Sequence, residues 1–374
     1  MAAPGARRQG SSTARLLLIL TAVLLGILFL FALLNAMKGP DDVPPPVVET
    51  TTSTATTTNP VTTLTTRPAP PTTAPPTTVP PTTVPPTTSP TVPPTTPPPQ
   101  DGMFVNDDYQ VPDPDPNPPA LPEPTTSDEL MAFLTDNPLY AQTAAAPVRC
   151  DIDQIDLTTA TKSQLKKHFD QLTACLMRVW GPTLDAAGFQ AVRPTVTIYS
   201  GQIQSACGKM PDQNALYCSA DQQVYYASNL PDIIPPTLRS ARFVVDSVVA
   251  HEFGHAVQAR TGILLSETYY EQSATQQNRE DLANDASRRT EMQADCFAGS
   301  FLRAIAQATG LAASDEKSIG KLFFSIGDDQ LTGDPTIDGN HGWGANRQTW
   351  LQAGLTNAAL SSCNTFVADD NSVR

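Results

Sequence analysis

Basic residues are scarce in this sequence of 374 residues, which has 23 lysines and arginines against 37 aspartates and glutamates. The formal net charge is −14, and charged residues of both signs make up only 16% of the chain. Because an acidic protein repels the phosphate backbone, we do not expect nucleic-acid binding to be a main function.

Cysteine is also sparse, and none of the six cysteines precedes residue 150. The paired C-x₂-C spacing of many structural zinc sites is missing, so a cysteine-ligated metal is not favoured. An even number of cysteines in a segment expected outside the cytoplasm predicts up to three disulfides. Spacing alone does not choose among the possible pairings. A short loop favours Cys207 with Cys218, and the pairs that then follow are Cys150–Cys175 and Cys296–Cys363.

Proline, by contrast, is crowded into one region, because 27 of the 37 prolines lie between Pro40 and Pro124. A tract this rich in proline and threonine cannot bury enough apolar surface to offset the entropy of ordering it. Its repeats favour extended polyproline II conformation. We interpret the tract as a spacer that contacts or crosses a cell-wall layer. A ligand for a proline-recognising module and a plain disordered tether are the alternatives.

One long apolar run, Leu16–Leu34, is just long enough to cross a bilayer as a helix. A cleaved signal peptide is the alternative, but its apolar region is normally shorter and Asn35-Ala36-Met37 is a poor cleavage site. Arginines before the run and a single lysine soon after it predict a cytoplasmic N-terminus. The sequence therefore predicts a cytoplasmic tail (1–15), a transmembrane anchor (16–37), a disordered linker (38–124) and an extracytoplasmic folded domain (125–374).

The C-terminal part carries patterns of both helices and strands, which predict an α+β domain with a small sheet. Helices are expected over residues 127–135 with Ser127 as the cap, 161–180 ended by Gly181-Pro182, 238–260, 288–308, 314–325 and 346–359. Strands are expected over 195–199, 216–218 and 223–227. The polar stretch 261–285 lacks periodicity and is expected to be a loop. Residues 214–227 are interpreted as an edge strand that can bind an extended peptide.

The clearest chemical signal is His251-Glu252-Phe253-Gly254-His255, an H-E-x-x-H pattern within the helix expected at 238–260. Histidines at i and i+4 share one helix face and can reach one cation, with Glu252 beside them. Two ordinary histidines on a half-buried helix are the alternative. The chain has only four histidines, and apolar flanks would bury these two, which is costly unless they are paired or metal-bound. The ligand types favour zinc over other divalent ions.

A third ligand is expected from a second helix, where Glu291 and Asp295 share a face. One carboxylate can bind the metal, and the other can accept the N–H of a metal-binding histidine and fix its ring. Alternatively, both carboxylates could pair with arginines on a solvated face: Arg288, Arg289 or Arg303.

These motifs resemble known peptidases. Glu291-x-x-Ala294-Asp295 is similar to the third-ligand helix of gluzincin-type peptidases. The run 291–299 (EMQADCFAG), the segment 217–225 (YCSADQQVY), and His341-Gly342 followed by Arg347 and Trp350 more closely resemble the bacterial neutral zinc metallopeptidase family. The resemblance covers residues 192–355.

The resemblance implies zinc bound by His251, His255 and Glu291, with Glu252 as the general base. It also makes His341 a candidate donor to the oxyanion, because related peptidases place a late histidine or tyrosine there. An ordinary histidine in a glycine-rich loop is the equal alternative for His341. Arg347 is a weaker candidate for the same role and His168 is interpreted as a surface residue.

The sequence therefore predicts a membrane-anchored, extracytoplasmic zinc metallopeptidase. It would hydrolyse peptide bonds of a peptide or protein substrate through zinc-activated water, with Glu252 as general base. One alternative is a zinc amidase that acts on cell-wall peptides. Another is a non-catalytic, wall-spanning binding or scaffold protein that keeps the metallopeptidase fold.

Overall fold

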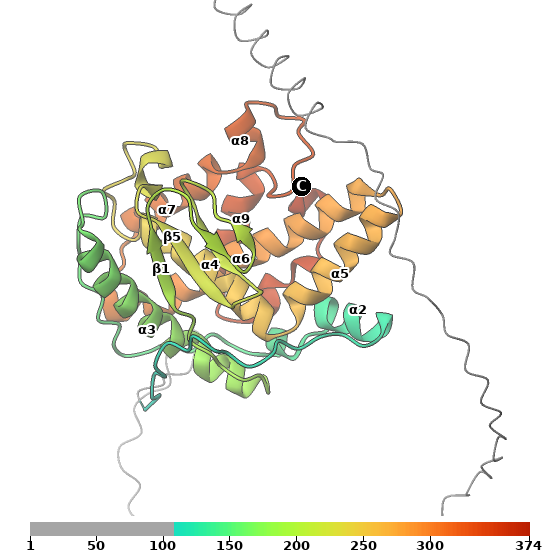
Figure 1. Cartoon of the computed structure of the whole chain (residues 1–374), viewed down its shortest axis with the longest axis horizontal. Helices are drawn as coiled ribbons and strands as arrows, with labels where there is room; N and C mark the ends of the chain where they lie inside the picture. The colour runs from blue at the N-terminus through green and yellow to red at the C-terminus, as the bar shows by residue number, and fades with distance from the viewer. Residues whose placement is uncertain (1–107) are drawn as a thin grey trace, which may run out of the picture. The chain divides into compact units, whose positions relative to one another are not determined.

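A three-stranded sheet lies against several helices in the part of the chain that the computed structural model describes, residues 108–374 (Figure 1). The central strand β5 (Gln223–Ala227) pairs in parallel with β1 (Val196–Tyr199) and antiparallel with β4 (Ala215–Cys218). A separate two-stranded ribbon joins β2 (Gln204–Ser205) to β3 (Gly208–Lys209). The three predicted strands are confirmed. Within the predicted edge segment, β4 is the outer strand and β5 is internal.

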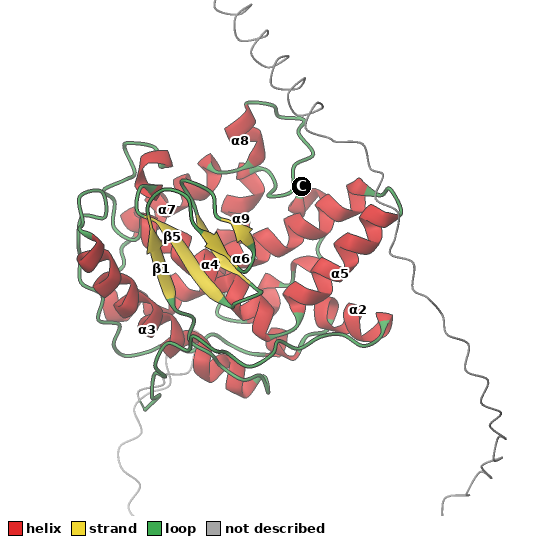
Figure 2. Ribbon diagram, viewed as in Figure 1, coloured by secondary structure: helices red, strands yellow, loops and turns green. Residues whose placement is uncertain are grey.

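Helices make up most of the rest, as Figure 2 shows, so the predicted α+β class with a small sheet is confirmed for residues 108–374. The α-helices are α2 (Ser127–Thr135), α3 (Lys162–Ala186), α4 (Val244–Arg260), α5 (Ile263–Gln276), α6 (Glu280–Thr309), α7 (Ala313–Ser325), α8 (Asp328–Thr332) and α9 (Gly344–Thr356). Short 3₁₀ turns are η1 (Pro138–Ala141), η2 (Leu230–Ile233), η3 (Leu360–Cys363), η4 (Thr365–Val367) and η5 (Asp370–Val373).

The prediction of a loop over 261–285 is wrong, because most of this stretch forms α5 and the beginning of α6. Gly262, with φ of 78°, makes the turn between α4 and α5 without the strain that a side chain would bring. The buried face of α5 includes Ser266 and Glu267. Since two of its buried positions are polar, hydrophobic periodicity does not reveal this helix.

The predicted end of α3 at Gly181-Pro182 is also wrong, since the helix continues to Ala186. A proline inside a helix costs about 3 kcal/mol. Val179, Trp180 and Leu184 flank it in the core, and burying each large apolar side chain contributes about 1.5–3 kcal/mol. Packing therefore outweighs the local cost.

Other helix boundaries shift by less. Thr126, not Ser127, caps α2, because its side chain accepts the N–H of Glu129. The helix α4 begins at Val244 rather than at 238, because Phe243 before it has the left-handed φ of 61°. The helix α6 begins eight residues earlier than the predicted 288, at Glu280.

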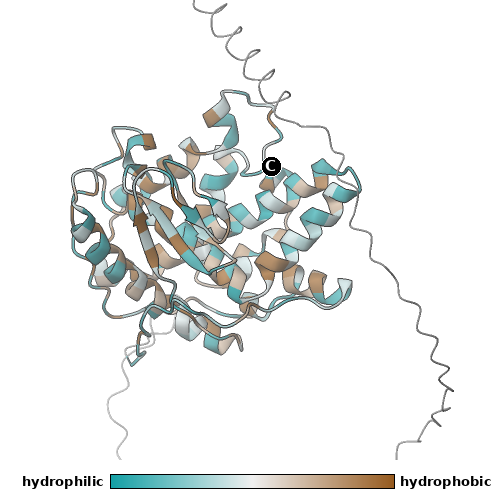
Figure 3. Cartoon of the chain, in the orientation of Figure 1, coloured by the Kyte–Doolittle hydropathy of each residue, from teal (hydrophilic) through white to brown (hydrophobic). Residues whose placement is uncertain are grey.

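The core forms where α6 packs against α4, α5 and α9. Its largest buried side chains include Trp180, Tyr226, Phe253, Phe297 and Phe301. Figure 3 shows hydrophobic residues along the strands and on the helices behind them. The helix α6 therefore lies at the centre of the domain. Packing on several sides holds the buried side chains of α6 in fixed positions.

Three disulfides join Cys150–Cys175, Cys207–Cys218 and Cys296–Cys363. These are the predicted pairs. The third one ties the middle of α6 to the turn η3 near the C-terminus.

The last part of the predicted linker, residues 108–124, lies along the domain. The backbone N–H of Asp115 donates to the carbonyl of Arg193, and the Arg260 guanidinium donates to the carbonyl of Pro119. Within residues 108–374, every helix is too short or too polar to span a bilayer. The predicted anchor at 16–37 lies outside the described residues.

Candidate metal centre

The candidate centre lies where α4 and α6 run side by side. Gly254, inside the H-E-x-x-H pattern, faces Ala294 of α6, and a Cβ on this glycine would lie 3.1 Å from the Ala294 Cα. The missing side chain therefore lets the two helix backbones approach closely. Because the two helices are close, side chains of α4 near Gly254 can contact side chains of α6 near Ala294.

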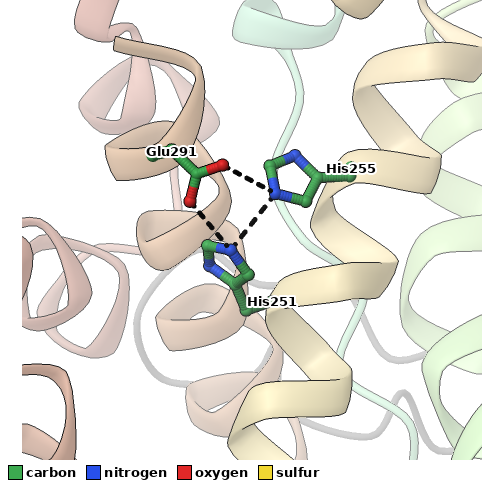
Figure 4. A group of neighbouring side chains, drawn as sticks. All are labelled: His251, His255 and Glu291. Atoms are coloured by element: carbon green, nitrogen blue, oxygen red, sulfur yellow. Dashed lines mark hydrogen bonds and ion pairs between the residues drawn. The ribbon is translucent and has the colours of Figure 1, made fainter. Parts of the chain in front are cut away.

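Three side chains from these helices point at a common centre (Figure 4). His251 Nε2 lies 3.2 Å from His255 Nε2 and 3.3 Å from Glu291 Oε2, and His255 Nε2 lies 3.4 Å from Glu291 Oε1. In a tetrahedral zinc site with bonds of about 2.0–2.1 Å, neighbouring ligand atoms are about 3.3 Å apart. The donor types, the Nε2–Nε2 separation and the carboxylate that faces both rings therefore suit a zinc ion held by three residues, with a fourth position left for another ligand. Among the described residues, these three form the one group that could hold a metal ion.

The other ring nitrogen of each histidine faces an acceptor. His251 Nδ1 lies 2.7 Å from Asp295 Oδ1, and His255 Nδ1 lies 2.8 Å from Gln258 Oε1. Such partners fix the tautomer and the ring orientation, which keeps Nε2 free for a metal. Gln258 is in turn held by its own donation to the Thr290 carbonyl. The structure thus brings Asp295 to its predicted position and adds Gln258, which the sequence analysis missed although it follows His255 by three residues.

Arg347, on α9, forms ion pairs with the carboxylates of Asp295 and Glu291. Its Nε and Nη2 each donate to the Asp295 carboxylate at 2.8 Å, and Nη2 lies 3.7 Å from Glu291 Oε2. All of these groups are buried or nearly so. The alternative that Glu291 and Asp295 pair with arginines of their own helix is wrong.

The charges favour a cation at the centre. Burial alone would lower the pKa of His251, but the carboxylates of Asp295 and Glu291 beside the ring raise it to about 10. Burial would raise the pKa of Glu291, but the two imidazoles hold it well below its usual range. A group that carries positive charge is therefore stabilised between these side chains, which is the electrostatic setting that a divalent ion requires.

Glu252 lies beside this cluster and is buried. The Tyr217 N–H, on strand β4, donates to Glu252 Oε2 at 2.8 Å. Burial raises the pKa of the Glu252 carboxyl, although His251 and His255 oppose the shift. The carboxylate is thus anchored through one oxygen and is more basic than an ordinary glutamate.

The sequence model of the family described as "Putative neutral zinc metallopeptidase" matches residues 134–366, which is more than half of the chain. The chain belongs to this family. Membership implies a zinc cofactor, and the donor set of His251, His255 and Glu291 fits that ion. No solved structure matches the chain.

Relatives of this family member occur in Escherichia coli and in mycobacteria. The chain is 28% identical over 245 residues to Uncharacterized protein YpfJ of Escherichia coli K12, covering 64% of this chain and 80% of the relative. It is 30% identical over 210 residues to Uncharacterized protein Rv2575 of Mycobacterium tuberculosis, covering 51% of this chain and 67% of the relative. Uncharacterized protein Mb2605 of Mycobacterium bovis matches to the same extent.

His341 lies in the loop between α8 and α9 of this family member, with its side chain half exposed. Its backbone N–H donates to Asp328 Oδ2, and its ring Nδ1 lies 3.4 Å from Asp328 Oδ1. Among residues 108–374, its recorded polar contacts are with Asp328 and none is with the three candidate ligands. The oxyanion role of His341 stays a prediction.

The interpretation of His168 as a surface residue is wrong. The ring is buried in α3, where Nε2 lies 2.6 Å from Asp246 Oδ1 and Nδ1 lies 2.9 Å from the Asp153 carbonyl. Burial lowers the pKa of His168, but the bond to Asp246 outweighs it and raises the pKa overall. Because both nitrogens face acceptors, the protonated ring is favoured. It links α3 to the first turn of the helix that carries the H-E-x-x-H pattern.

Proposed function

We propose that this protein is a zinc metallopeptidase whose ion is held by His251, His255 and Glu291. One observation carries the proposal: the two imidazole Nε2 atoms lie 3.2 Å apart, and each faces a different oxygen of the Glu291 carboxylate at 3.3–3.4 Å. The family match supports a peptidase. When bound, zinc acts as a Lewis acid that polarises the scissile carbonyl and makes a water molecule a better nucleophile.

Glu252 is proposed as the general base. Tyr217 holds one carboxylate oxygen in place, so the other oxygen is free to take a proton from the attacking water and later to pass it to the leaving amine. The raised pKa strengthens the carboxylate as a base. Asp295 and Gln258 orient the two imidazoles, and Arg347 balances the charge of Asp295.

We also propose that residues 16–37 anchor the chain in a membrane and that the predicted linker, from residue 38 up to the segment 108–124 that lies along the domain, holds the peptidase domain outside the cytoplasm. The three disulfides support an oxidising compartment, because such bonds are rare in the cytosol. In this arrangement the linker contacts the cell wall, and the substrate is a peptide or protein at the outer surface.

The test compares the full-length wild type with Glu252→Gln, using casein and purified cell-wall peptides as substrates. We expect casein cleavage by the wild type, with the variant retaining zinc and losing at least about 100-fold in kcat/KM. Cleavage of wall peptides alone would identify the amidase. Absence of any cleavage by the zinc-loaded wild type would leave the non-catalytic scaffold and refute the proposal.

A further inference from the structure

A buried carboxylate without a partner lies on α5, outside the cluster just described. Glu267 is only 5% exposed. Among residues 108–374, no hydrogen bond or ion pair to its carboxylate is recorded. Burying a charge is costly unless a counter-charge or a hydrogen bond compensates it. Such a group therefore calls for a partner that the folded chain does not supply.

The surroundings of Glu267 are acidic. Its side chain lies on the buried face of α5, and α5 packs against both α4 and α6. Burial, Glu271 and Glu291 raise the pKa of Glu267 to about 8. Glu267 therefore lies within electrostatic range of the proposed metal ligand Glu291, and the groups that act on it are burial and other carboxylates.

Two buried hydroxyls without a hydrogen-bond partner also lie on α5 and α6. Ser266 Oγ, adjacent to Glu267 in the chain, and Thr290 Oγ1, adjacent to Glu291, are both buried without a hydrogen-bond partner among the described residues. A hydroxyl oxygen can accept a hydrogen bond, as a carboxylate does. The helices α5 and α6, which pack together here, therefore carry buried oxygen acceptors for which the described residues supply no donor.

The zinc ion itself does not remove this excess of acceptors. Taken with zinc, the formal charges of Glu252, Glu291, Asp295 and Arg347 sum to zero when the histidines are neutral. Ionised Glu267 would add a negative charge that nothing in the site balances, so its ionisation calls for a cation. It is not part of a second three-ligand metal site either, since among residues 108–374 only His251, His255 and Glu291 form such a group.

We propose that Glu267 determines substrate specificity by binding a cationic amine of the substrate near the scissile bond. An ammonium group offers three donors and one positive charge, which suits a buried carboxylate without a partner. The amine belongs either to the N-terminus of the substrate or to a basic side chain. This inference rests on the proposed peptidase function and gives that function a substrate class.

The test uses full-length, zinc-loaded protein and one peptide in matched versions: free or acetylated at the N-terminus, and with lysine or the neutral norleucine beside the cleaved bond. We expect kcat/KM of the wild type to favour a cationic version at least about tenfold. Glu267→Gln should lose this preference while it cleaves the neutral peptide at the wild-type rate and keeps its zinc. The matched control Glu280→Gln, an exposed carboxylate on the adjoining helix, should keep the preference.

The pattern of loss identifies the source of the amine. Loss on acetylation assigns the N-terminal ammonium, and loss on the norleucine exchange assigns the side chain. Equal cleavage of charged and neutral peptides by the wild type, or an unchanged preference in Glu267→Gln, would overturn the inference.

A second measurement separates this inference from the proposed function. Lysinamide, which carries both kinds of amine, should raise the Tm of the zinc-loaded wild type and of Glu280→Gln but not of Glu267→Gln. Without ligand, Glu267→Gln should have a Tm at or above that of the wild type, because a buried carboxyl group without a partner is removed. Lysinamide that leaves the wild-type Tm unchanged, or a ligand-free variant that loses Tm, would contradict a binding role even if no peptide is cleaved.

Discussion

The buried ion pair between Arg347 and Asp295 offers a direct test of the packing around the proposed metal centre. Arg347→Met removes two hydrogen bonds of 2.8 Å and leaves the Asp295 carboxylate, which is fully buried, without its guanidinium. Breaking a buried pair in this way costs about 3–5 kcal/mol. In chelator the protonated His251 partly compensates Asp295, so we expect a loss near the lower end, about 3 kcal/mol.

The assay is urea unfolding of the full-length chain in detergent with EDTA, followed by tryptophan fluorescence. The chain has three tryptophans, Trp180, Trp343 and Trp350, and all of them lie in the described domain. The signal therefore reports this domain alone. For a domain of this size, a loss of 1 kcal/mol lowers Tm by about 2–4 °C, so a thermal scan should show a drop of about 6–12 °C.

A matched control uses Arg279, which forms a similar pair with Asp281 on the exposed surface of the same domain. Arg279→Met should change the free energy of unfolding far less than Arg347→Met does, because solvent screens an exposed ion pair. A double-mutant cycle of Arg347→Met with Asp295→Asn should give a coupling energy of at least about 1 kcal/mol. If Arg347→Met costs no more than the surface control, or if the coupling vanishes, the buried pair does not stabilise the site as argued.

Two further expectations follow from the histidine contacts. Gln258→Leu removes the acceptor of the His255 ring and should weaken zinc affinity about 10–100-fold in a competition titration with a chelator. The exposed Gln272→Leu should leave that affinity unchanged. The raised pKa of His168 means that its bond to Asp246 stabilises the fold fully below the unfolded pKa of about 6.5, and that this contribution is lost as pH rises through the folded pKa. Unfolding free energies of wild type and Asp246→Asn should therefore differ most at low pH, and a difference that grows with pH would contradict a protonated ring.

Local patterns predicted the parts of the fold that local forces determine. The β-branched run in β1 and the spacing of His251 and His255 on one helix face needed no distant information. The short loop predicted Cys207–Cys218, and the structure also has the two further pairs that were expected, although the four remaining cysteines could pair in three ways. Glu291 was found because it follows an H-E-x-x-H pattern.

Contacts between residues far apart in the sequence determine the features that local patterns did not predict. The helix α3 continues through Pro182 because the residues around it are core, and α5 was missed because polar side chains lie on its buried face. Asp246, the partner of His168, is 78 residues further along the chain. Arg347 is 52 residues from Asp295, and only the packing of α9 on α6 brings them together.

The most direct test of the proposed metal centre is elemental analysis of the purified full-length protein, beside His251→Ala and Glu291→Gln. The account predicts about one equivalent of zinc in the wild type and little or none in either variant, with folding of each variant checked by circular dichroism. Wild-type protein that binds no zinc, or folded variants that retain a full equivalent, would contradict a site built from these two helices.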